Sequence, residues 1–209
     1  MLILPQFFGR VGQAGGGEPS GTTFEDHFTS PANQRLDDRD GWDVAIQGRR
    51  IAFIDPSGLG LSSANETFEL DQLETLYMPT IQPDGDGPAY FEVDWIGRNI
   101  SLNFGYAFLG YVDETNFVGL RFAGIGGVGT RAGNVVNGSF SPLIQWQSFD
   151  GDTIRLELEG ATLRVYQNGT QQGSTTVDAK FDGATGVGIQ IESSTNKGPF
   201  FSRWKSGNL

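Results

Sequence analysis

The stretch "TIRLELEGATLRVYQNG", residues 153–169, decides the fold class. Apolar and charged residues alternate strictly in its first half, from Ile154 to Glu159. Alternation of this kind is typical of a half-buried antiparallel strand with one polar face. The chain then turns at "EGAT", runs back through "LRVYQ" and reaches Asn168-Gly169, a dipeptide that strongly favours a hairpin turn. The stretch therefore predicts antiparallel strands joined by tight turns.

The same period of two recurs on both sides of this stretch. It appears in "TFEDHF" (23–28), and the segments "GVGIQIE" (186–192) and "FFSRW" (200–204) are expected to close the domain as strands. The segment 69–76, "ELDQLETL", has helical spacing but could equally be a strand. The 31 glycines follow no collagen-like period and indicate many turns. Many short strands in a chain of this length predict an all-β, two-sheet antiparallel jelly-roll sandwich.

Charge and composition exclude several classes of protein. The net charge of −11 and the pI of about 4.4 create a field that repels phosphate backbones, so we expect no nucleic-acid partner. The absence of cysteine excludes disulfides and thiolate metal sites. The opening "MLILPQFFGR" lacks the basic region of a signal peptide and is interrupted by Pro5. No apolar run approaches the roughly 20 residues of a membrane span, so we expect no membrane insertion.

The first 21 residues differ in composition from the rest of the chain. An apolar, aromatic segment is followed by the Gly-rich link "VGQAGGGEPSG". These residues could form a disordered tail, but we favour an arm that docks into another subunit. The apolar side chains available for docking are Leu2, Ile3, Leu4, Phe7 and Phe8. This interpretation predicts an extended N-terminal arm at 1–21, a jelly-roll domain at 22–209, and a homo-oligomer.

Several phrases, taken in order, resemble the concanavalin A-like lectin/glucanase superfamily, particularly its laminin-G-like members. They are "FEDHF" followed by "RLDDRDGWDV", then "YFEVDW", "DETNFVGLRF", the hairpin stretch above, and "GATGVGIQIESS" followed by "FFSRW". The resemblance covers residues 24–204 and implies a jelly roll. That scaffold is shared by lectins, hydrolases, adhesion modules and structural domains, so it does not by itself give the function.

The stretch "AYFEVDWIGRNI" (89–100) carries Glu92 and Asp94 on the same side of an expected strand. Glycosidases need two carboxyl groups about 5–9.5 Å apart. The jelly-roll glucanases that the chain resembles place three acids, Glu, Asp and Glu, along one strand. Here Trp95 is followed by Ile96 and Gly97, so the third acid is missing. We therefore expect an acidic strand face, no glycanase activity, and a protein that is not an enzyme.

Two acidic, glycine-bearing turns could bind Ca²⁺. They are "PDGDGP" (83–88) and "DGD" (150–152), and their carboxylates belong to Asp84, Asp86, Asp150 and Asp152. The resemblance raises this expectation, because lectin-like domains often carry Ca²⁺ at the rim of a sheet. Plain turns remain the simpler interpretation. The glycine-rich "GIGGVG" (124–129) is followed by no helix, which favours a loop over a nucleotide site.

The segment "NFGYAFLGYVDETN" (103–116) is the candidate carbohydrate-binding surface. Sugar sites combine aromatic platforms with nearby polar groups. The residues that could supply both are Tyr106, Phe108, Tyr111, Asp113 and Asn116. The four tryptophans are further candidates, although any of these aromatic residues could instead belong to the core.

Together these features favour a non-enzymatic structural protein of a tailed-phage virion. It would be a capsid spike, a decoration protein or a tail-fibre component, joined to other virion proteins through the arm, with a lectin-like domain for host glycans. The alternative is a free bacterial carbohydrate-binding domain or glycanase-associated module, secreted or on the cell surface. The second class would bind a glycan without the arm.

Overall fold

The computed structural model describes residues 23–29, 34–46, 48, 50–54, 60–65, 75–84, 87–96, 105–121, 129–191 and 201–209. Within these ranges nearly all regular structure is β-strand, and one short 3-10 turn, Ala179–Phe181, is the only helical element. No helix in the described part of the chain is long and apolar enough to cross a membrane.

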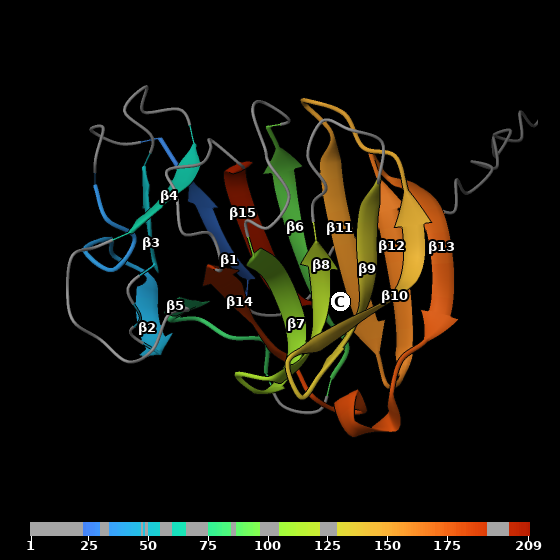
Figure 1. Cartoon of the computed structure of the whole chain (residues 1–209). Helices are drawn as coiled ribbons and strands as arrows, with labels where there is room; N and C mark the ends of the chain where they lie inside the picture. The colour runs from blue at the N-terminus through green and yellow to red at the C-terminus, as the bar shows by residue number, and fades with distance from the viewer. Residues whose placement is uncertain are drawn as a thin grey trace, which may run out of the picture.

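Two large antiparallel sheets make up the sandwich (Figure 1). The six-stranded sheet contains, in spatial order, β1 (Thr23–His27), β15 (Phe201–Asn208), β6 (Ala89–Trp95), β11 (Thr153–Glu159), β12 (Thr162–Gln167) and β13 (Thr170–Thr176). The seven-stranded sheet contains β10 (Ser139–Trp146), β9 (Thr130–Val136), β8 (Asn116–Arg121), β7 (Gly105–Asp113), β14 (Gly186–Ile191), β5 (Thr75–Pro79) and β2 (Trp42–Ile46). The strands β3 (Arg50–Ile54) and β4 (Leu61–Asn65) pair with each other. The predicted all-β, two-sheet antiparallel sandwich is confirmed.

The hairpin stretch folds as its pattern predicts. The strands β11 and β12 pair in register, so that Leu156 lies opposite Val165 on the buried side. Both residues of the following turn have positive φ, 51° at Asn168 and 76° at Gly169. Two successive positive φ values define the turn type whose twist matches a β-hairpin. This explains why the Asn-Gly dipeptide correctly predicts the strand that follows, β13.

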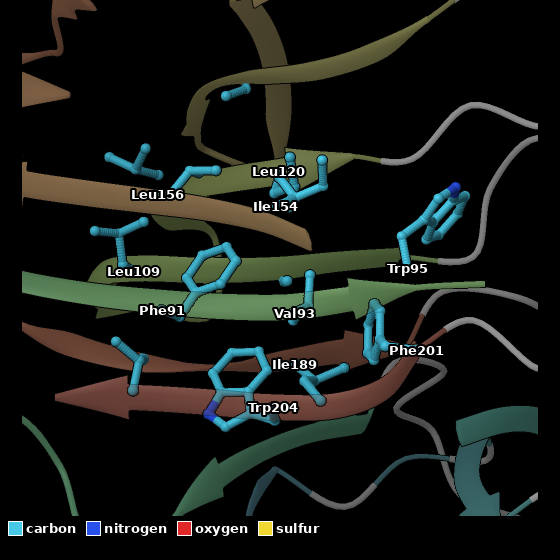
Figure 2. Close-up of a cluster of buried hydrophobic side chains, with 14 of the residues drawn as sticks. Phe91, Val93, Trp95, Leu109, Leu120, Ile154, Leu156, Ile189, Phe201 and Trp204 are labelled. Atoms are coloured by element: carbon cyan, nitrogen blue, oxygen red, sulfur yellow. The ribbon is translucent and has the colours of Figure 1, made fainter. Parts of the chain in front are cut away.

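The core fills the space between the two large sheets (Figure 2). Phe91 and Trp204, from the neighbouring strands β6 and β15, are fully buried and stack with ring centroids 5.1 Å apart. Trp42 meets Trp204 edge-on at 5.7 Å. From the opposite sheet, Leu109 and Ile189 complete this part of the cluster. The tryptophans weighed as glycan contacts are therefore buried side chains, with Trp146 the most exposed of them at 9%.

Some sequence predictions fall outside the described residues. Residues 1–21 are among these, so the docking arm and its boundary stay predictions. The ambiguous segment 69–76 enters β5 at Thr75, and residues 69–74 lie outside the described residues. The same holds for Asp86 and for 124–128 of the glycine-rich stretch.

Candidate functional site

The outer face of the seven-stranded sheet carries a second apolar cluster, separate from the core. On β7, Ala107 and Leu109 point into the core, whereas Tyr106 and Phe108 point outward. Alternate side chains of a strand lie on opposite faces, so a strand that is apolar at successive positions supplies both clusters. The whole of Gly105 to Gly110 is buried for this reason.

Five rings on this outer face form one aromatic layer, made of Tyr106, Phe108, Tyr111, Phe117 and Phe140. The ring of Phe117 lies 5.4 Å from Tyr106 and 5.2 Å from Phe108, measured between centroids. Tyr111 lies 5.5 Å from Phe108, and Phe140 lies 5.5 Å from Tyr106. These separations and the tilted or edge-on geometries are favourable for aromatic pairs. The layer therefore joins strands β7, β8 and β10 into one continuous surface.

Glycines explain how these rings come to lie against the sheet. In the strand register Phe108 is flanked by Gly119 on β8 and Gly188 on β14. A Cβ atom at Gly119 would lie 2.7 Å from Cδ1 of Tyr106, and one at Gly188 would lie 2.5 Å from Cζ of Phe108. Both distances are too short for any side chain, so the rings occupy the space that glycine leaves open.

Only part of the layer is accessible. Phe108 and Phe117 are completely buried and Tyr106 is 3% exposed, while Tyr111 and Phe140 are half-buried. The guanidinium carbon of Arg121 lies 5.3 Å from the centroid of Tyr106 and 5.9 Å from that of Phe140. A cation over an aromatic face is attracted by the ring. The surface that a ligand can reach therefore combines half-buried rings with a positioned guanidinium.

Tyr111 is a half-buried residue of this layer that carries a hydrogen-bonding group. Burial, together with the nearby charges of Glu114 and Asp113, raises the pKa of Tyr111 above its ordinary value. A phenol is protonated at neutral pH even at its ordinary pKa, so its hydroxyl can both donate and accept a hydrogen bond. A sugar hydroxyl needs a partner of this kind.

Asp113 is the last residue of β7, two residues beyond Tyr111, and it meets Asn116, the first residue of β8, across the turn between these strands. Oδ1 of Asp113 accepts hydrogen bonds from Nδ2 of Asn116 and from the backbone nitrogen of Thr115, each at 2.8 Å. These bonds, with that of Asn116 the largest contribution, lower the pKa of Asp113. Oδ1 of Asn116 accepts a further hydrogen bond from Nζ of Lys180 at 3.2 Å.

The structure thus brings Tyr106, Phe108 and Tyr111 into one layer and joins Asp113 to Asn116 beside it. Glycan binding by these five residues stays a prediction. The sequence does not predict Phe117, Phe140 or Arg121 as part of this layer, because they lie on other strands. The cross-strand contacts that bring them to Tyr106 depend on the register of the sheet, which the sequence does not show.

The outer face of the six-stranded sheet is mainly charged. Glu92 and Asp94 lie on this face, and a single guanidinium, that of Arg203 on β15, binds both. Nη2 of Arg203 lies 2.6 Å from Oε1 of Glu92, and Nε lies 2.8 Å from Oδ2 of Asp94. Nη1 also reaches Glu25 on β1 at 3.3 Å. The acidic strand face that the sequence predicted is therefore paired with an arginine from the neighbouring strand.

These contacts shift the protonation of the groups involved. Burial alone would raise the pKa of Asp94, but hydrogen bonds from Arg203 and Thr153 and the charge of Arg203 lower it below its ordinary value. The hydrogen bond to Asp94 is the largest of the contributions that raise the pKa of Arg203. Both groups are therefore charged at neutral pH.

Opposite charges also alternate across the strands of this face. In the register, Glu25 faces Lys205, Lys205 faces Glu92, and Glu92 faces Arg155. Opposite charges directly across a strand pair stabilise a sheet. Arg155 in turn covers the ring of Tyr90, with its guanidinium carbon 4.1 Å from the ring centroid.

The acidic turn at 150–152 is built around Asp152, which is 8% exposed. Its Oδ2 accepts hydrogen bonds from the backbone nitrogen of Phe149 at 2.5 Å and from Nε2 of Gln167 at 2.6 Å. Its Oδ1 accepts one from Nδ2 of Asn168 at 2.7 Å. Three donors from two segments therefore occupy the carboxylate of Asp152.

The second acidic turn is tied to the C-terminal strand. The backbone nitrogen of Asp84 donates to Oδ1 of Asn208 at 2.9 Å, and Nδ2 of Asn208 donates back to the carbonyl oxygen of Asp84 at 3.1 Å. In the described part of the chain no three His, Cys, Asp or Glu side chains are arranged to hold a metal ion. Ca²⁺ binding through Asp84, Asp86, Asp150 and Asp152 stays a prediction.

No protein-family model and no curated protein matches the chain. Solved structures do resemble it. A prokaryotic β-1,3-1,4-glucanase (lichenase) from a mouse hindgut metagenome has a TM-score of 0.60 and 11% identity, over 90% of this chain and 100% of that one. An endo-1,3-β-glucanase from Streptomyces sioyaensis gives 0.53 and 13%, over 94% and 100%. Carbohydrate-binding module CBM66 from Bacillus subtilis gives 0.51 and 12%, over 80% and 92%.

These likenesses confirm the jelly-roll fold and contradict one expectation. We expected a protein that is not an enzyme, but the similar structures are mostly glucanases and transglycosylases. The expectation rested on one missing acid in the strand that carries Glu92 and Asp94. A missing acid on one strand does not exclude an enzyme, because neighbouring strands also place carboxylates on the same face of the sheet, as Glu25 does here. Identities of 10–15% show the fold alone.

Proposed function

We propose that the chain binds a β-glucan-type polysaccharide on the outer face of its seven-stranded sheet. The observation that carries this proposal is the aromatic layer with Arg121 over two of its rings. Sugar rings present apolar CH groups that pack against aromatic side chains, and their hydroxyls need polar partners beside those rings. Tyr111 and Arg121 supply such partners on the accessible part of the layer.

The named activities of the structural neighbours support the choice of ligand. Of the three structures compared above, two are described as β-glucanases and one as a carbohydrate-binding module. A carbohydrate-binding domain fits the described residues better than a virion component, because the contacts that support it all lie on the domain itself.

The test is binding to a panel of soluble polysaccharides, lichenan and laminarin included, measured by affinity electrophoresis and calorimetry. We expect Tyr111→Ala and Arg121→Ala each to weaken binding about tenfold, which corresponds to about 1.4 kcal/mol. Tyr166→Ala removes a half-buried tyrosine from the six-stranded sheet and is the matched control, expected to bind like the wild type. Binding that is unchanged in both test variants, or no binding to any member of the panel, would exclude this site.

Glycan cleavage is a second candidate function, favoured by the paired carboxylates on β6. Glu92 and Asp94 lie on one face of the strand, and Nη2 of Arg203 lies 2.6 Å from Oε1 of Glu92 and 2.9 Å from Oδ1 of Asp94. Two carboxylates that share one nitrogen are close together, as are the acid and nucleophile of retaining glycosidases, whose carboxyl groups are about 5–5.5 Å apart. Release of reducing ends from β-glucans, lost in Glu92→Gln and Asp94→Asn but kept in Glu159→Gln, would establish it. A wild type without such release would refute it.

A virion location remains a separate proposal about residues 1–21. The five apolar side chains Leu2, Ile3, Leu4, Phe7 and Phe8 could anchor the domain to a larger assembly or to further copies of itself. Burying each of them is worth roughly 1.5–3 kcal/mol before ordering costs. A chain that lacks residues 1–21 should keep its fold and its glycan binding but fail to assemble. Normal assembly without them would leave the virion proposal unsupported.

A further inference from the structure

The alternation of side chains along β7 is interrupted at Gly110. Before this point it is regular, with Phe108 in the aromatic layer and Leu109 in the core. If the alternation continued, Tyr111 would follow Leu109 into the core, since residues two apart share a face. Tyr111 instead belongs to the aromatic layer, with its ring centroid 5.5 Å from that of Phe108, three residues earlier. The strand therefore contains one extra residue before Tyr111.

The pairing of β7 with β14 contains the same extra residue. Phe108 pairs with Gly188. Three residues further along β7, Tyr111 pairs with Gly186, which is only two residues from Gly188. The register with β8 also shifts in this part of the strand. An extra residue of this kind is a β-bulge, and bulges change the direction of the side chains next to them.

Glycine suits this bulge for two reasons. The φ of Gly110 is +63°, a left-handed conformation that residues with a side chain rarely adopt. A Cβ atom at Gly110 would also point into the core, 2.7 Å from Cδ2 of Leu158 on the facing sheet. Leu109 and Gly110 thus both face the core, and Gly110 adds no side chain to it. Two consecutive residues on the core side return Tyr111 to the outer face.

The outer face has space for the ring of Tyr111. A Cβ atom at Gly186 would lie 3.0 Å from Cβ of Tyr111 and 3.4 Å from Cε of Met78, so glycine lets Tyr111 pack closely against β14. Met78 packs against the same layer. Tyr111 is half-buried in this position, so part of its side chain remains accessible to a ligand.

We propose that Gly110 is a positioning residue of the glycan site, because its bulge turns Tyr111 out of the core and onto the aromatic layer, where the phenol ring contacts the polysaccharide. The inference rests on the proposed function for the ligand alone, since the direction of Tyr111 can be measured without one. Gly110 has no side chain and acts only through Tyr111. A branched residue at position 110 favours a regular strand, in which Tyr111 faces the core.

The first measurement uses the full chain without a ligand. NMR should detect nuclear Overhauser contacts between the ring protons of Phe108 and Tyr111, and Gly110→Val should abolish them. Gly151→Val is the matched control, because Gly151 also has a positive φ, +90°, but lies in an exposed turn with nothing within 4 Å of an added Cβ atom. The control should keep the contacts. Ring contacts that persist in Gly110→Val overturn the proposal.

A second variant covers the case in which Gly110→Val does not fold. Gly110→Ala adds one methyl group at the same position, and it should weaken the Phe108–Tyr111 contacts less than valine does. Contacts in Gly110→Ala as strong as in the wild type would then overturn the proposal.

The second measurement is lichenan binding by affinity electrophoresis. Gly110→Val should weaken binding about tenfold, as Tyr111→Ala does. The double variant Gly110→Val/Tyr111→Ala should bind no more weakly than Tyr111→Ala, because both changes remove the same contact. Gly151→Val should bind like the wild type. A further tenfold loss in the double variant would mean that Gly110 does not act through Tyr111, and would overturn the positioning role.

The two measurements separate this inference from the proposed function. If Gly110→Val loses the ring contacts but the wild type binds no polysaccharide, the ligand contact fails with the proposed function and the placement of Tyr111 by Gly110 stands. If Tyr111→Ala weakens lichenan binding but Gly110→Val binds like the wild type, the positioning role fails and the proposed function stands.

Discussion

The two outer faces of this sandwich differ in what holds them together. The seven-stranded sheet carries an aromatic layer in which Phe108 and Phe117 are completely buried. The six-stranded sheet carries cross-strand ion pairs centred on Arg203, whose carboxylate partners remain partly exposed. Both faces point away from a single core, so the core alone does not require either chemistry.

The difference shows that the two outer faces of one jelly roll can be held together by different interactions, apolar packing on one face and ion pairs on the other. Apolar burial is non-directional and favours close packing, which the glycines beside Phe108 permit. Ion pairs at a partly exposed face contribute less stability but fix side-chain positions. The aromatic layer should therefore dominate stability, and the charged face should dominate the response to pH and salt.

Replacing Phe108 tests whether the aromatic layer makes the larger contribution to stability. Phe108→Ala deletes a fully buried ring that contacts Tyr111 and Phe117, and it should lower the free energy of unfolding by about 3–5 kcal/mol. Tyr166→Ala, on the other sheet, should cost less than about 1 kcal/mol, because that side chain is only half-buried. Urea unfolding followed by tryptophan fluorescence measures both. Equal losses would show that the outer layer adds nothing to the core.

Removing Arg203 should have an intermediate effect. Arg203→Met keeps the aliphatic stem but leaves Glu92 and Asp94 without their shared partner. Hydrogen bonds to charged groups are worth about 1.5–3 kcal/mol, and we expect a loss in that range. Arg164→Met is the control, since Arg164 pairs with Glu159, whose side chain is 55% exposed. A loss no larger than in the control would mean that the Arg203 cluster is as weak as a surface pair.

The strands of the charged face were the easier ones to predict from the sequence. Strict alternation from Ile154 to Glu159 specifies both the strand and the side that faces the core, and the structure follows it. The Asn168-Gly169 turn likewise fixes its own conformation through two positive φ values. Both signals are local, so a single sequence suffices to interpret them.

The aromatic face was harder to predict, because its pattern does not alternate. A strand apolar on both sides, such as Gly105 to Gly110, is compatible with burial between any two layers. The sequence placed Tyr106 and Tyr111 near each other, but Phe140 and Arg121 meet them only through strand pairing. For the same reason the contact between Arg203 and Asp94 could not be predicted, because the two residues are 109 positions apart in the chain. Contacts between distant strands require the register of the sheet.

The two Asn-Gly turns offer a smaller and well-matched test. Asn168 accepts a hydrogen bond from the backbone nitrogen of Thr153 and donates one to Asp152. The side chain of Asn137 makes no hydrogen bond with another described residue, although its φ is the same 51°. Asn168→Gly should therefore lower the free energy of unfolding by about 1–2 kcal/mol, and Asn137→Gly by a few tenths. Thermal unfolding of both variants measures these losses. Equal decreases in melting temperature would mean that the hydrogen bonds of Asn168 at the Asp152 turn contribute no stability.

The pH dependence of Asp94 should be the smallest effect. Its native pKa lies below the unfolded value of about 3.9, so the stability it contributes is fully present above that value. The stability is lost as the pH falls through the native pKa. The difference in free energy of unfolding between wild type and Asp94→Asn should stay constant from about pH 7 to 5 and shrink at lower pH.

The magnitude of that difference should remain below about 1 kcal/mol, because the Asp94 side chain is 32% exposed and its ion pair with Arg203 is screened by solvent. Salt at about 1 M should reduce it further. In the Arg203→Met background the same Asp94→Asn substitution should show much weaker pH dependence, since the main cause of the lowered pKa has been removed. Denaturant unfolding at a series of pH values gives the free energies of unfolding of the wild type, the two single variants and the double variant. A difference that grows on acidification would have the wrong sign and would place the native pKa of Asp94 above its unfolded value.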